Sequence, residues 1–453
     1  MNSKLQVYMS KTFSIGGIHP DDNKISKDAV IEDFPPVKTT FISMSQHVGA
    51  PAEPIVVKGD KVKVGQLIAK SSGFISANIH SSASGTVRSL EMLPDLAGNP
   101  VQHVVIDVEG DEWVETIDRS KEIIRDIKLG KEEIIKRIAD CGIVGLGGAA
   151  FPTHIKLTPP PGKVADILLI NGSECEPYLT SDYRIMLEKP EEILIGARIM
   201  MKALNVKQAY VGIEENKPEA IKSMEAVTDK FYPDIKIVSL KKRYPQGGEK
   251  QLIDAITGRR VPSMGLPIDV GVVVQNVGTA FAVYEAVQKG KPLIDTVVTI
   301  TGKCVSEQKN YRIRVGTTFD TVINAIGGFP KDAAKLISGG PMMGKAVSCI
   351  DAASVKSTSG LLFLTEEETK RKPENNCLRC AKCVAACPMG LQPFFLNKLA
   401  HAGKMDELEE NMVQDCIECG CCMYTCPAHI PLLDVIRLSK NKVLKIMRSR
   451  PKN

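Results

Sequence analysis

One cysteine motif occurs twice near the carboxyl end of the chain. In each copy three cysteines are separated from one another by two residues, and a fourth follows after three intervening residues, directly before a proline. The first copy contains Cys377, Cys380, Cys383 and Cys387, and the second contains Cys416, Cys419, Cys422 and Cys426. The repeat constrains the fold strongly, because thiolates at these intervals wrap around a common inorganic centre.

The spacing is that of bacterial ferredoxins with two [4Fe-4S] clusters, in which the cysteine before proline ligates the neighbouring cluster. We therefore expect two crossed ligand sets in a unit that moves single electrons. The first set is Cys377, Cys380, Cys383 and Cys426, and the second set is Cys416, Cys419, Cys422 and Cys387. Cys421 lies inside the second motif but off the ligand spacing, so we expect a packed thiol there.

Zinc sites and disulfides explain this pattern less well. A tetrahedral zinc site uses pairs of Cys or His and gives no role to a third and fourth cysteine at these spacings. A disulfide framework suits short secreted chains, whereas this chain has 453 residues and opens without a signal-peptide pattern. The other cysteines, which are scattered singly, are expected to be mostly small buried residues: Cys141, Cys175, Cys304 and Cys349.

Length and composition describe a globular protein of several domains. A chain of 453 residues exceeds what one hydrophobic core can hold, so about three or four domains are expected. The net charge of +5 and the single tryptophan argue against nucleic-acid binding. The most apolar stretch, 270–287, is broken by polar residues, so we expect no membrane-spanning segment. Iron–sulfur ligation without an export signal predicts a reducing cytoplasm.

Residues from about 40 to 110 indicate a small all-β unit. Short β-branched runs, such as 104–108, alternate with Gly, Ser, Asp and Pro. Segments 59–69 and 79–87 resemble the flattened barrel of lipoyl and biotinyl carrier domains. Those domains carry a modified lysine at a hairpin tip, but the corresponding stretch, 71–76, has none. We therefore expect a scaffold barrel without a prosthetic group.

The pattern then changes to helices alternating with apolar strands over residues 131–289. Runs such as 167–170 and 270–274 between helical segments are typical of an α/β sheet domain. Residues 293–346 combine strands with one short predicted helix at 319–326, which suits a small α+β module.

A glycine-rich loop, 142–151, follows the helical pattern of 131–140. Clustered glycines let backbone N–H groups approach a phosphate, and a helix that starts after the loop would add its positive end. The loop is not a Rossmann fingerprint, because it follows a helix rather than the first strand. It is not a P-loop either, because no Gly-Lys-Ser/Thr closes it. Taken alone, it suits a nucleotide site and a ligand-free turn equally.

Polar clusters follow several predicted strands. They are Asn171–Pro177, Tyr244–Glu249 and Gln275–Thr279. In α/β folds, ligands bind at the carboxyl ends of the sheet strands. Together with the glycine loop, these segments predict a site for a large, flat ligand that carries phosphate.

At these residues the chain resembles a known family. The glycine loop up to Lys156 and the three polar clusters are similar, in the same order, to the flavin- and NADH-binding subunit of respiratory complex I. With the opening 13–20, the amino-terminal barrel and the two ferredoxin motifs, the chain from about Phe13 to Leu433 resembles the C subunits of Rnf electron-transport complexes. Those complexes are membrane ion pumps that exchange electrons between NADH and ferredoxin.

The resemblance implies two groups of ligand-binding residues. FMN is expected at Gly145, Gly147, Gly148, Lys156, Asn171, Ser173, Glu174, Gly247, Asn276 and Thr279. NADH is expected at Phe151, Glu176 and Glu249. Two positions depart from the complex I pattern, because Ser173 replaces an acidic residue and Gly278 replaces a glutamate. No side chain is expected to act as an acid–base catalyst, because the cofactors supply the chemistry.

The expected fold is therefore multidomain, of α/β plus α+β class. Its predicted divisions are a lipoyl/biotinyl-like barrel over 1–125, an FMN- and NADH-binding α/β domain over 126–290, a β-grasp-like domain over 291–366, a two-[4Fe-4S] ferredoxin-type domain over 367–436 and a basic tail over 437–453.

The resemblance implies an NADH-oxidising subunit of an ion-translocating complex. Electrons would pass from NADH through FMN to the two clusters and on to partner subunits and, indirectly, ferredoxin. The expected location is peripheral, on the cytoplasmic side of the cell membrane. Two alternatives remain: a soluble flavin and iron–sulfur corrinoid reductase, and a flavin-free electron-wiring scaffold. The basic, apolar-interleaved tail predicts either contact with acidic lipid or a membrane subunit, or a solvated terminal helix.

Overall fold

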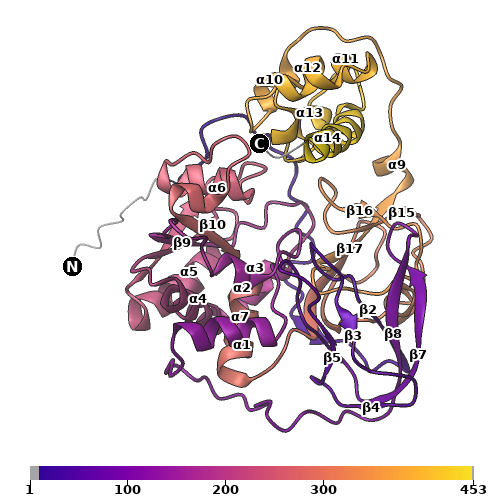
Figure 1. Ribbon diagram of the computed structural model, residues 1–453. Helices are drawn as coiled ribbons and strands as arrows, with labels where there is room; N and C mark the ends of the chain where they lie inside the picture. The colour runs from indigo at the N-terminus through magenta and orange to yellow at the C-terminus, as the bar shows by residue number, and fades with distance from the viewer. Residues whose placement is uncertain (1–9, 451–453) are drawn as a thin grey trace.

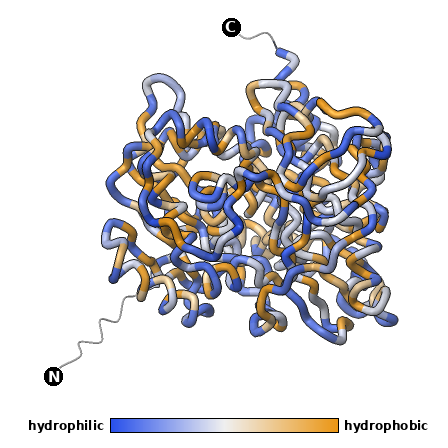
Figure 2. Tube along the Cα trace, turned by 90° about the horizontal axis from the view of Figure 1, so that it is seen from below, coloured by the Kyte–Doolittle hydropathy of each residue, from blue (hydrophilic) through white to orange (hydrophobic). Residues whose placement is uncertain are grey.

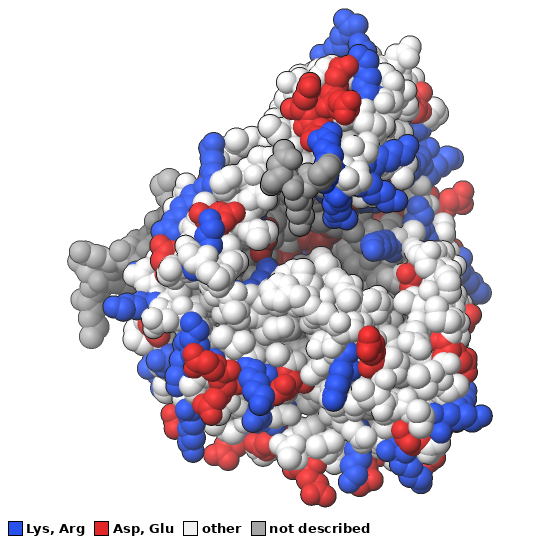
Figure 3. All heavy atoms as spheres, in the orientation of Figure 1, with Lys and Arg blue, Asp and Glu red and all other residues white. Residues whose placement is uncertain are grey.

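A computed structural model describes residues 10–450 and consists of four packed units (Figure 1). Their order along the chain is the predicted one. A β-barrel comes first, followed by an α/β unit, a second β-rich unit and a helical unit, which is at the top of Figure 1. Figure 3 shows basic and acidic side chains interspersed over the visible face, so this face carries no broad patch of one sign.

The first unit is a barrel made of two antiparallel sheets. The four-stranded sheet has the order β2 (Thr39–Ser43), β8 (Pro100–Val108), β7 (Gly85–Pro94) and β4 (Lys61–Val62). The three-stranded sheet has the order β3 (Glu53–Pro54), β5 (Leu67–Lys70) and β6 (Ile79–His80). Inward side chains such as Ile42, Ile68 and Val104 share one core. The loop between β5 and β6 exposes Phe74, which is 86% accessible.

The second unit contains a parallel sheet with the order β11 (Ile235–Leu240), β10 (Ala209–Glu214), β9 (Ile167–Asn171) and β12 (Val272–Asn276). The middle strands β9 and β10 are mostly buried, as in a sheet covered on both faces. Its helical elements are α1 (Lys131–Asp140), α2 (Thr153–Lys156), α3 (Ser181–Glu188), α4 (Pro190–Leu204), α5 (Pro218–Phe231), α6 (Glu249–Thr257), η1 (Pro267–Val270) and α7 (Val277–Lys289). Because all the strands are parallel, their carboxyl ends meet at one edge.

The helix expected after the glycine loop is only one turn long. α2 covers four residues, and Thr158 with the three prolines that follow it ends the helix there. The glycine loop therefore does not lead into a long helix whose positive end could bind an anion.

The third unit is a mixed six-stranded sheet. Its order is β1 (Ile31–Asp33), β14 (Lys309–Arg314), β13 (Asp295–Thr301), β17 (Gly360–Thr365), β15 (Ala333–Ser338) and β16 (Lys345–Ala346). The helices α8 (Phe319–Ala325) and α9 (Glu366–Thr369) accompany it. β1 pairs with β14, so a segment that the predicted divisions gave to the barrel belongs to this sheet.

The fourth unit is helical. It contains α10 (Lys382–Ala386), α11 (Pro393–His401), α12 (Met405–Glu410), η2 (Val413–Asp415), α13 (Cys421–Tyr424) and α14 (Leu432–Ser449). One face of α14 places Leu432, Ile436 and Val443 in the core of this unit. The predicted boundary between residues 436 and 437 falls inside α14, so residues 437–449 continue a helix that packs on this unit.

Residues 10–30, here called the amino-terminal strap, run across three of the four units before the chain enters the barrel. Lys11 pairs with β11, and Ile18 forms a bridge with Tyr244 beyond the same strand. The backbone N–H of Gly17 donates to the carbonyl of Ala386 in the helical unit, at 2.9 Å. The strap therefore ties the sheet edge of the α/β unit to the helical unit.

Candidate functional site

The glycine loop lies against the start of α7 at the sheet edge. The backbone N–H of Leu146 donates to the Thr279 hydroxyl at 3.0 Å. Asn276 caps α7 through its side-chain oxygen, which accepts from the Gly278 N–H at 2.7 Å. A Cβ atom on Gly147 would lie 2.7 Å from the Asn276 side-chain nitrogen. Glycine is therefore required at 147 for the loop and the Asn276 cap to approach this closely.

Asn171 connects a second group of predicted residues at the end of β9. Its side-chain nitrogen donates to the Gly247 carbonyl at 2.8 Å, and its oxygen accepts from the Ser173 N–H at 3.1 Å. The Gly247 N–H in turn donates to the Cys175 sulfur at 3.3 Å. The polar loops after β9 and β11 are thus joined to each other, as expected for loops that converge on one end of the sheet.

The segments around this edge hold several buried polar atoms without a hydrogen-bond partner. Among the described residues, they include side-chain atoms of Thr153, His154, Ser173, Gln246 and Gln275. Unpaired buried polar atoms are costly and are rare in folded proteins. They fit a polar ligand held between the glycine loop and the strand ends.

Lys156 and Glu249 form an ion pair, although the sequence assigned them to different ligands. Their nitrogen and oxygen atoms are 2.6 Å apart, and the two side chains are 32% and 39% exposed. Lys156 also donates to the Val274 carbonyl at 3.2 Å. Glu249 is the first residue of α6, so the pair lies at a helix amino terminus beside β12. Phe151 is half-buried and closes the glycine loop, because its carbonyl accepts from the Gly145 N–H.

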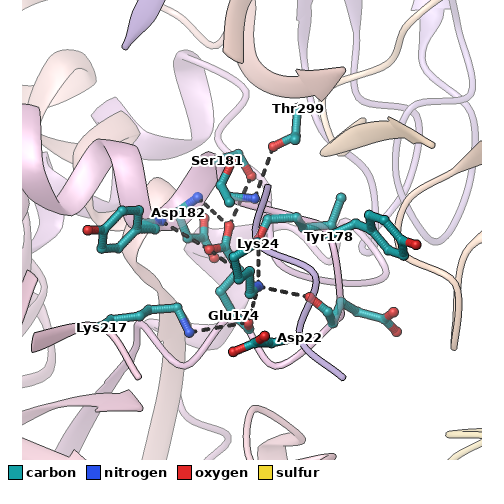
Figure 4. A network of polar contacts seen from close by, with 12 residues as sticks. Asp22, Lys24, Glu174, Tyr178, Ser181, Asp182, Lys217 and Thr299 are labelled. Atoms are coloured by element: carbon teal, nitrogen blue, oxygen red, sulfur yellow. Dashed lines mark hydrogen bonds and ion pairs between the residues drawn. The ribbon is translucent and has the colours of Figure 1, made fainter. Parts of the chain in front are cut away.

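Glu174 and Glu176 have partners that the sequence did not predict. The Glu174 carboxylate accepts from the Asp182 N–H at 2.7 Å and so caps the start of α3 (Figure 4). The Glu176 carboxylate accepts from the backbone N–H groups of Met342 and Met343, at 3.0 and 2.9 Å, in the loop after β15. These carboxylates are therefore engaged within the protein, whereas the predictions gave Glu174 to FMN and Glu176 to NADH.

Asp182 is a buried acid that sequence reasoning missed. Its carboxylate accepts from the Asn276 side chain at 2.7 Å, next to the glycine loop. Burial, and then the neighbouring Glu174 carboxylate, raise its pKa to about 7. Asp182 follows the strand-end cluster by several residues and lies in a helix, so no motif marked it.

Four predicted cluster ligands surround one apolar pocket in the helical unit. Cys387, Cys416, Cys419 and Cys422 line it, together with residues such as Leu396 and Ile436. Backbone N–H groups donate to two of the sulfur atoms at 3.4 Å, those of Cys387 and Cys416. Burial raises the pKa of the Cys416 thiol to about 11, and the nearby Cys419 and Cys387 add to this rise. Thiols gathered in an apolar pocket with N–H donors match the donor set of an iron–sulfur cluster.

The other four ligands are placed differently. Cys377 and Cys380 are exposed on the segment that precedes α10, and Cys383 is buried in that helix. Burial raises the pKa of Cys383, and the nearby Cys426 of the second motif raises it further. Thus a cysteine of each motif lies beside the other motif's set. No three Cys, His, Asp or Glu side chains within residues 10–450 are close enough to share one metal ion.

The pocket of the second motif adjoins the polar edge of the α/β unit. The single proton of the Tyr244 hydroxyl is shared between two acceptors, the Cys419 carbonyl at 3.0 Å and the Glu176 carboxylate at 3.4 Å. Gln251 of α6 donates to the Pro388 carbonyl at 3.2 Å. Cys421 is fully buried in this junction, beside Tyr244, in accordance with the prediction of a packed thiol. The predicted flavin loops and one cluster site are therefore neighbours.

α14 reaches the second motif through its basic residues. Lys440 donates to the Cys416 carbonyl at 2.7 Å and to the Glu418 carboxylate at 3.0 Å, and Arg437 pairs with the same carboxylate. Part of the segment predicted as a tail therefore supports the loop that carries a cluster ligand.

We expect Lys440→Met to make the reduction potential of the cluster at the second motif more negative. Removal of a cation beside Cys416 disfavours the added electron, because local charge sets cluster potentials. Redox titration followed by EPR would measure the change. Lys442→Met, on the exposed side of the same helix, is the control and should leave the potential unchanged. An unchanged reduction potential in Lys440→Met would show that the charge of Lys440 does not influence this cluster.

Comparisons with known proteins agree with this arrangement. Family models match residues 11–111 (RnfC barrel sandwich hybrid domain), 138–285 (Nuo51 FMN-binding domain), 297–346 (SLBB domain) and 369–427 (4Fe-4S dicluster domain). The fold and the site thus define an iron–sulfur flavoprotein of electron transport.

Relatives identify the family. The chain is 48% identical over 404 residues to the C subunit of the proton-translocating ferredoxin:NAD(+) oxidoreductase complex of Clostridium ljungdahlii, and the match spans 89% of this chain and 87% of the relative. It is 43% identical to the C subunit of the Na(+)-translocating ferredoxin:NAD(+) oxidoreductase complex of Acetobacterium woodii, over 95% and 96% of the two chains. The chain belongs to the family of C subunits of ion-translocating oxidoreductase complexes.

Among solved structures, a chain of an NAD+-reducing [NiFe]-hydrogenase in the H2-reduced state is similar to this one. The match covers 71% of this chain and 63% of the hydrogenase chain, with a TM-score of 0.49 and 16% identity.

Figure 2 shows that hydrophobic and hydrophilic stretches alternate throughout the trace. Across residues 10–450, none of the helices combines the length and the apolar character needed to cross a bilayer.

Proposed function

We propose that this chain is the NADH-oxidising subunit of a membrane-associated, ion-translocating complex, in which electrons from NADH pass via FMN to two [4Fe-4S] clusters and on to partner subunits on the ferredoxin side. The names of the relatives support the complex, and the FMN-binding and dicluster family models support the cofactors. The observation that carries the proposal is the junction at Tyr244, which joins the polar edge of the α/β unit to the pocket of the second cysteine motif.

The chemistry requires both kinds of site. NADH releases two electrons together as hydride, whereas a [4Fe-4S] cluster takes one, and bound FMN supplies the conversion. The residues of this chain bind and orient FMN and NADH. In this proposal the glycine loop, Asn171, Asn276 and Thr279 hold FMN. Lys156 belongs to the FMN side, and its partner Glu249 contributes to NADH binding, where the carboxylate can accept from hydroxyl or amide groups.

For the clusters we assign the crossed ligand sets. The pocket shared by Cys387 with Cys416, Cys419 and Cys422 supports the second set, and the packing of Cys426 against the core that contains Cys383 supports the first. The second set adjoins the α/β unit, and the first includes the exposed Cys377 and Cys380. The first set is therefore the one that faces a partner.

Membrane association is proposed to be peripheral, on the cytoplasmic side, through partner subunits. It rests on the ion-translocating complexes named for the relatives.

Spectroscopy of anaerobically purified protein tests the function. We expect stoichiometric FMN, two [4Fe-4S] clusters and bleaching of the flavin and cluster absorbance on addition of NADH. Protein with clusters but no FMN would favour the scaffold alternative. Protein with FMN that NADH does not reduce would overturn the proposed donor. Reduction of a free corrinoid by the isolated chain would favour the corrinoid-reductase alternative. The position of the barrel before the flavin domain argues against that alternative.

Glu249→Ala should weaken productive NADH binding by roughly ten- to a hundredfold, because a hydrogen bond to a charged acceptor contributes about 1.5–3 kcal/mol. FMN should remain bound, since Lys156 keeps its bond to the Val274 carbonyl. Steady-state KM for NADH and flavin content would be measured. Glu132→Ala is the matched control, because Glu132 is exposed in the first turn of α1. Loss of FMN from the Glu249 variant would show that this carboxylate belongs to the flavin site.

A further inference from the structure

The loop that follows β9 adopts a conformation that needs external support. Glu174 and Tyr178 both have φ in the left-handed region, at 45° and 69°. Residues other than glycine hold such angles at a cost in free energy, so the surrounding structure must stabilise them. This loop begins at Asn171 and Ser173, which belong to the proposed flavin site, so whatever fixes the loop also fixes them.

Lys24 of the amino-terminal strap provides this support (Figure 4). Its ammonium group donates to the carbonyls of Glu174, Glu176 and Leu179, at 2.8, 2.9 and 2.5 Å. An ammonium group has three N–H donors, so all of them are satisfied by this one loop. The Lys24 side chain is 11% exposed, and the Glu174 carboxylate lies 3.8 Å away. Such a buried cation is held by its acceptors and its counter-ion.

The strap around Lys24 is itself fixed to the same loop. The Tyr178 N–H donates to the Asp22 carbonyl at 2.8 Å, and the hydroxyl groups of Ser26 and Thr180 are 2.7 Å apart. On the other side of the loop, Lys217 donates to the Ser173 carbonyl at 2.6 Å. Two lysines therefore hold the backbone from which the predicted flavin residues project, and one of them comes from outside the α/β unit.

The charge of Lys24 has an effect of its own. FMN carries a phosphate, and reduction adds electrons to the flavin, so a cation buried behind the binding loop favours both binding and reduction. In a poorly solvated interior this attraction is much less screened than at the surface. Negative charge on the nearby acids, Glu174, Glu214 and Asp182, has the opposite effect on FMN binding and reduction. The favourable local charge therefore comes from the two lysines.

We propose that Lys24 is a positioning residue of the flavin site, which orders the loop over 171–179 through three carbonyl groups and favours the reduced cofactor through its charge. This inference rests on the proposed function, and it adds a residue that no flavin motif contains. The opening segment of the chain thereby becomes part of the cofactor site.

The test compares Lys24→Met with Lys291→Met in the full chain. Lys291 is also a buried ion-paired lysine, 10% exposed, held by Glu285 and Asp295. It lies just past the end of α7 that is opposite to Asn276, about 20 Å along the helix from the flavin site. Both variants should lose thermal stability. Only Lys24→Met should bind FMN at least tenfold more weakly and show a lower flavin midpoint potential.

Wild-type FMN affinity and potential in Lys24→Met, with stability lowered as in Lys291→Met, would overturn the proposal and leave Lys24 a purely structural role. If Lys24→Met does not fold, Lys24→Arg decides. A guanidinium keeps the charge but cannot direct three protons from one atom, so weaker FMN binding with a potential near that of the wild type is expected. Unchanged FMN affinity in Lys24→Arg would refute the proposal. Absence of FMN from the wild-type protein would instead count against the proposed function.

Discussion

Gly147→Val should yield a protein that carries both iron–sulfur clusters but no FMN. The glycine loop can pass Asn276 only without a side chain at 147, because an added Cβ would lie 2.7 Å from the Asn276 nitrogen and 3.0 Å from its Cβ and Cγ. Such contacts force either the loop or the α7 cap to move. Either movement removes backbone N–H groups from the place where they meet a phosphate. Flavin release on denaturation and iron content would be measured.

Gly148→Ala is the comparison for this variant. A Cβ at Gly148 meets no protein atom within 4 Å, so this change leaves the loop and Asn276 where they are. The alanine variant should fold normally and lose less FMN than Gly147→Val. Full FMN occupancy in Gly147→Val would show that the flavin does not depend on this close approach.

Cys387→Ser should abolish the cluster associated with the second motif, although Cys387 belongs to the first. In the structure Cys387 shares its pocket with Cys416, Cys419 and Cys422, and the carbonyl of the neighbouring Pro388 accepts from Gln251 of the α/β unit. Loss of one thiolate removes a quarter of the ligands of a cubane, and a serine hydroxyl is a poor replacement. Iron content should fall by about half. EPR should show that the cluster of Cys377, Cys380 and Cys383 persists.

Cys421→Ala is the matched control for this experiment. Cys421 is also buried and lines the same pocket, but it lies off the ligand spacing. It should keep both clusters and lose only some stability. Selective loss of the first-motif cluster in Cys387→Ser would overturn the crossed assignment.

Local patterns in the sequence predicted those parts of the site that depend on residues near one another in the chain. The cysteine spacing, the glycine loop and the strand-end clusters at Asn171 and Asn276 all lie where the sequence placed them, because a turn or a motif is determined by a few consecutive residues. The order of the four units was predicted for the same reason. Each unit has its own sequence pattern: short β-branched runs mark the barrel, for example, and alternating helices and strands mark the α/β unit.

Roles that depend on distant partners were not predictable in this way. Glu176 follows a strand, as a ligand-binding acid would, but its carboxylate is held by Met342 and Met343, more than 160 residues later. Glu174 likewise meets Lys24 and the start of α3. The basic pattern of residues 437–449 was recognised, but not the partner of its apolar face, because Val443 packs in the helical unit. Each outcome depends on tertiary contacts, within a unit or between units, that the local pattern does not encode.

The strap also sets an order of events during synthesis. It leaves the ribosome before the four units described above, yet Gly17 bonds to Ala386, about 370 residues later in the chain. At about 5–20 residues per second, the strap waits roughly 20 to 75 s for that partner. During this interval the barrel, whose strands β2 to β8 pair with one another within residues 39–108, can already fold. This contact of the strap with the cluster unit therefore closes late, after the whole α/β unit has emerged.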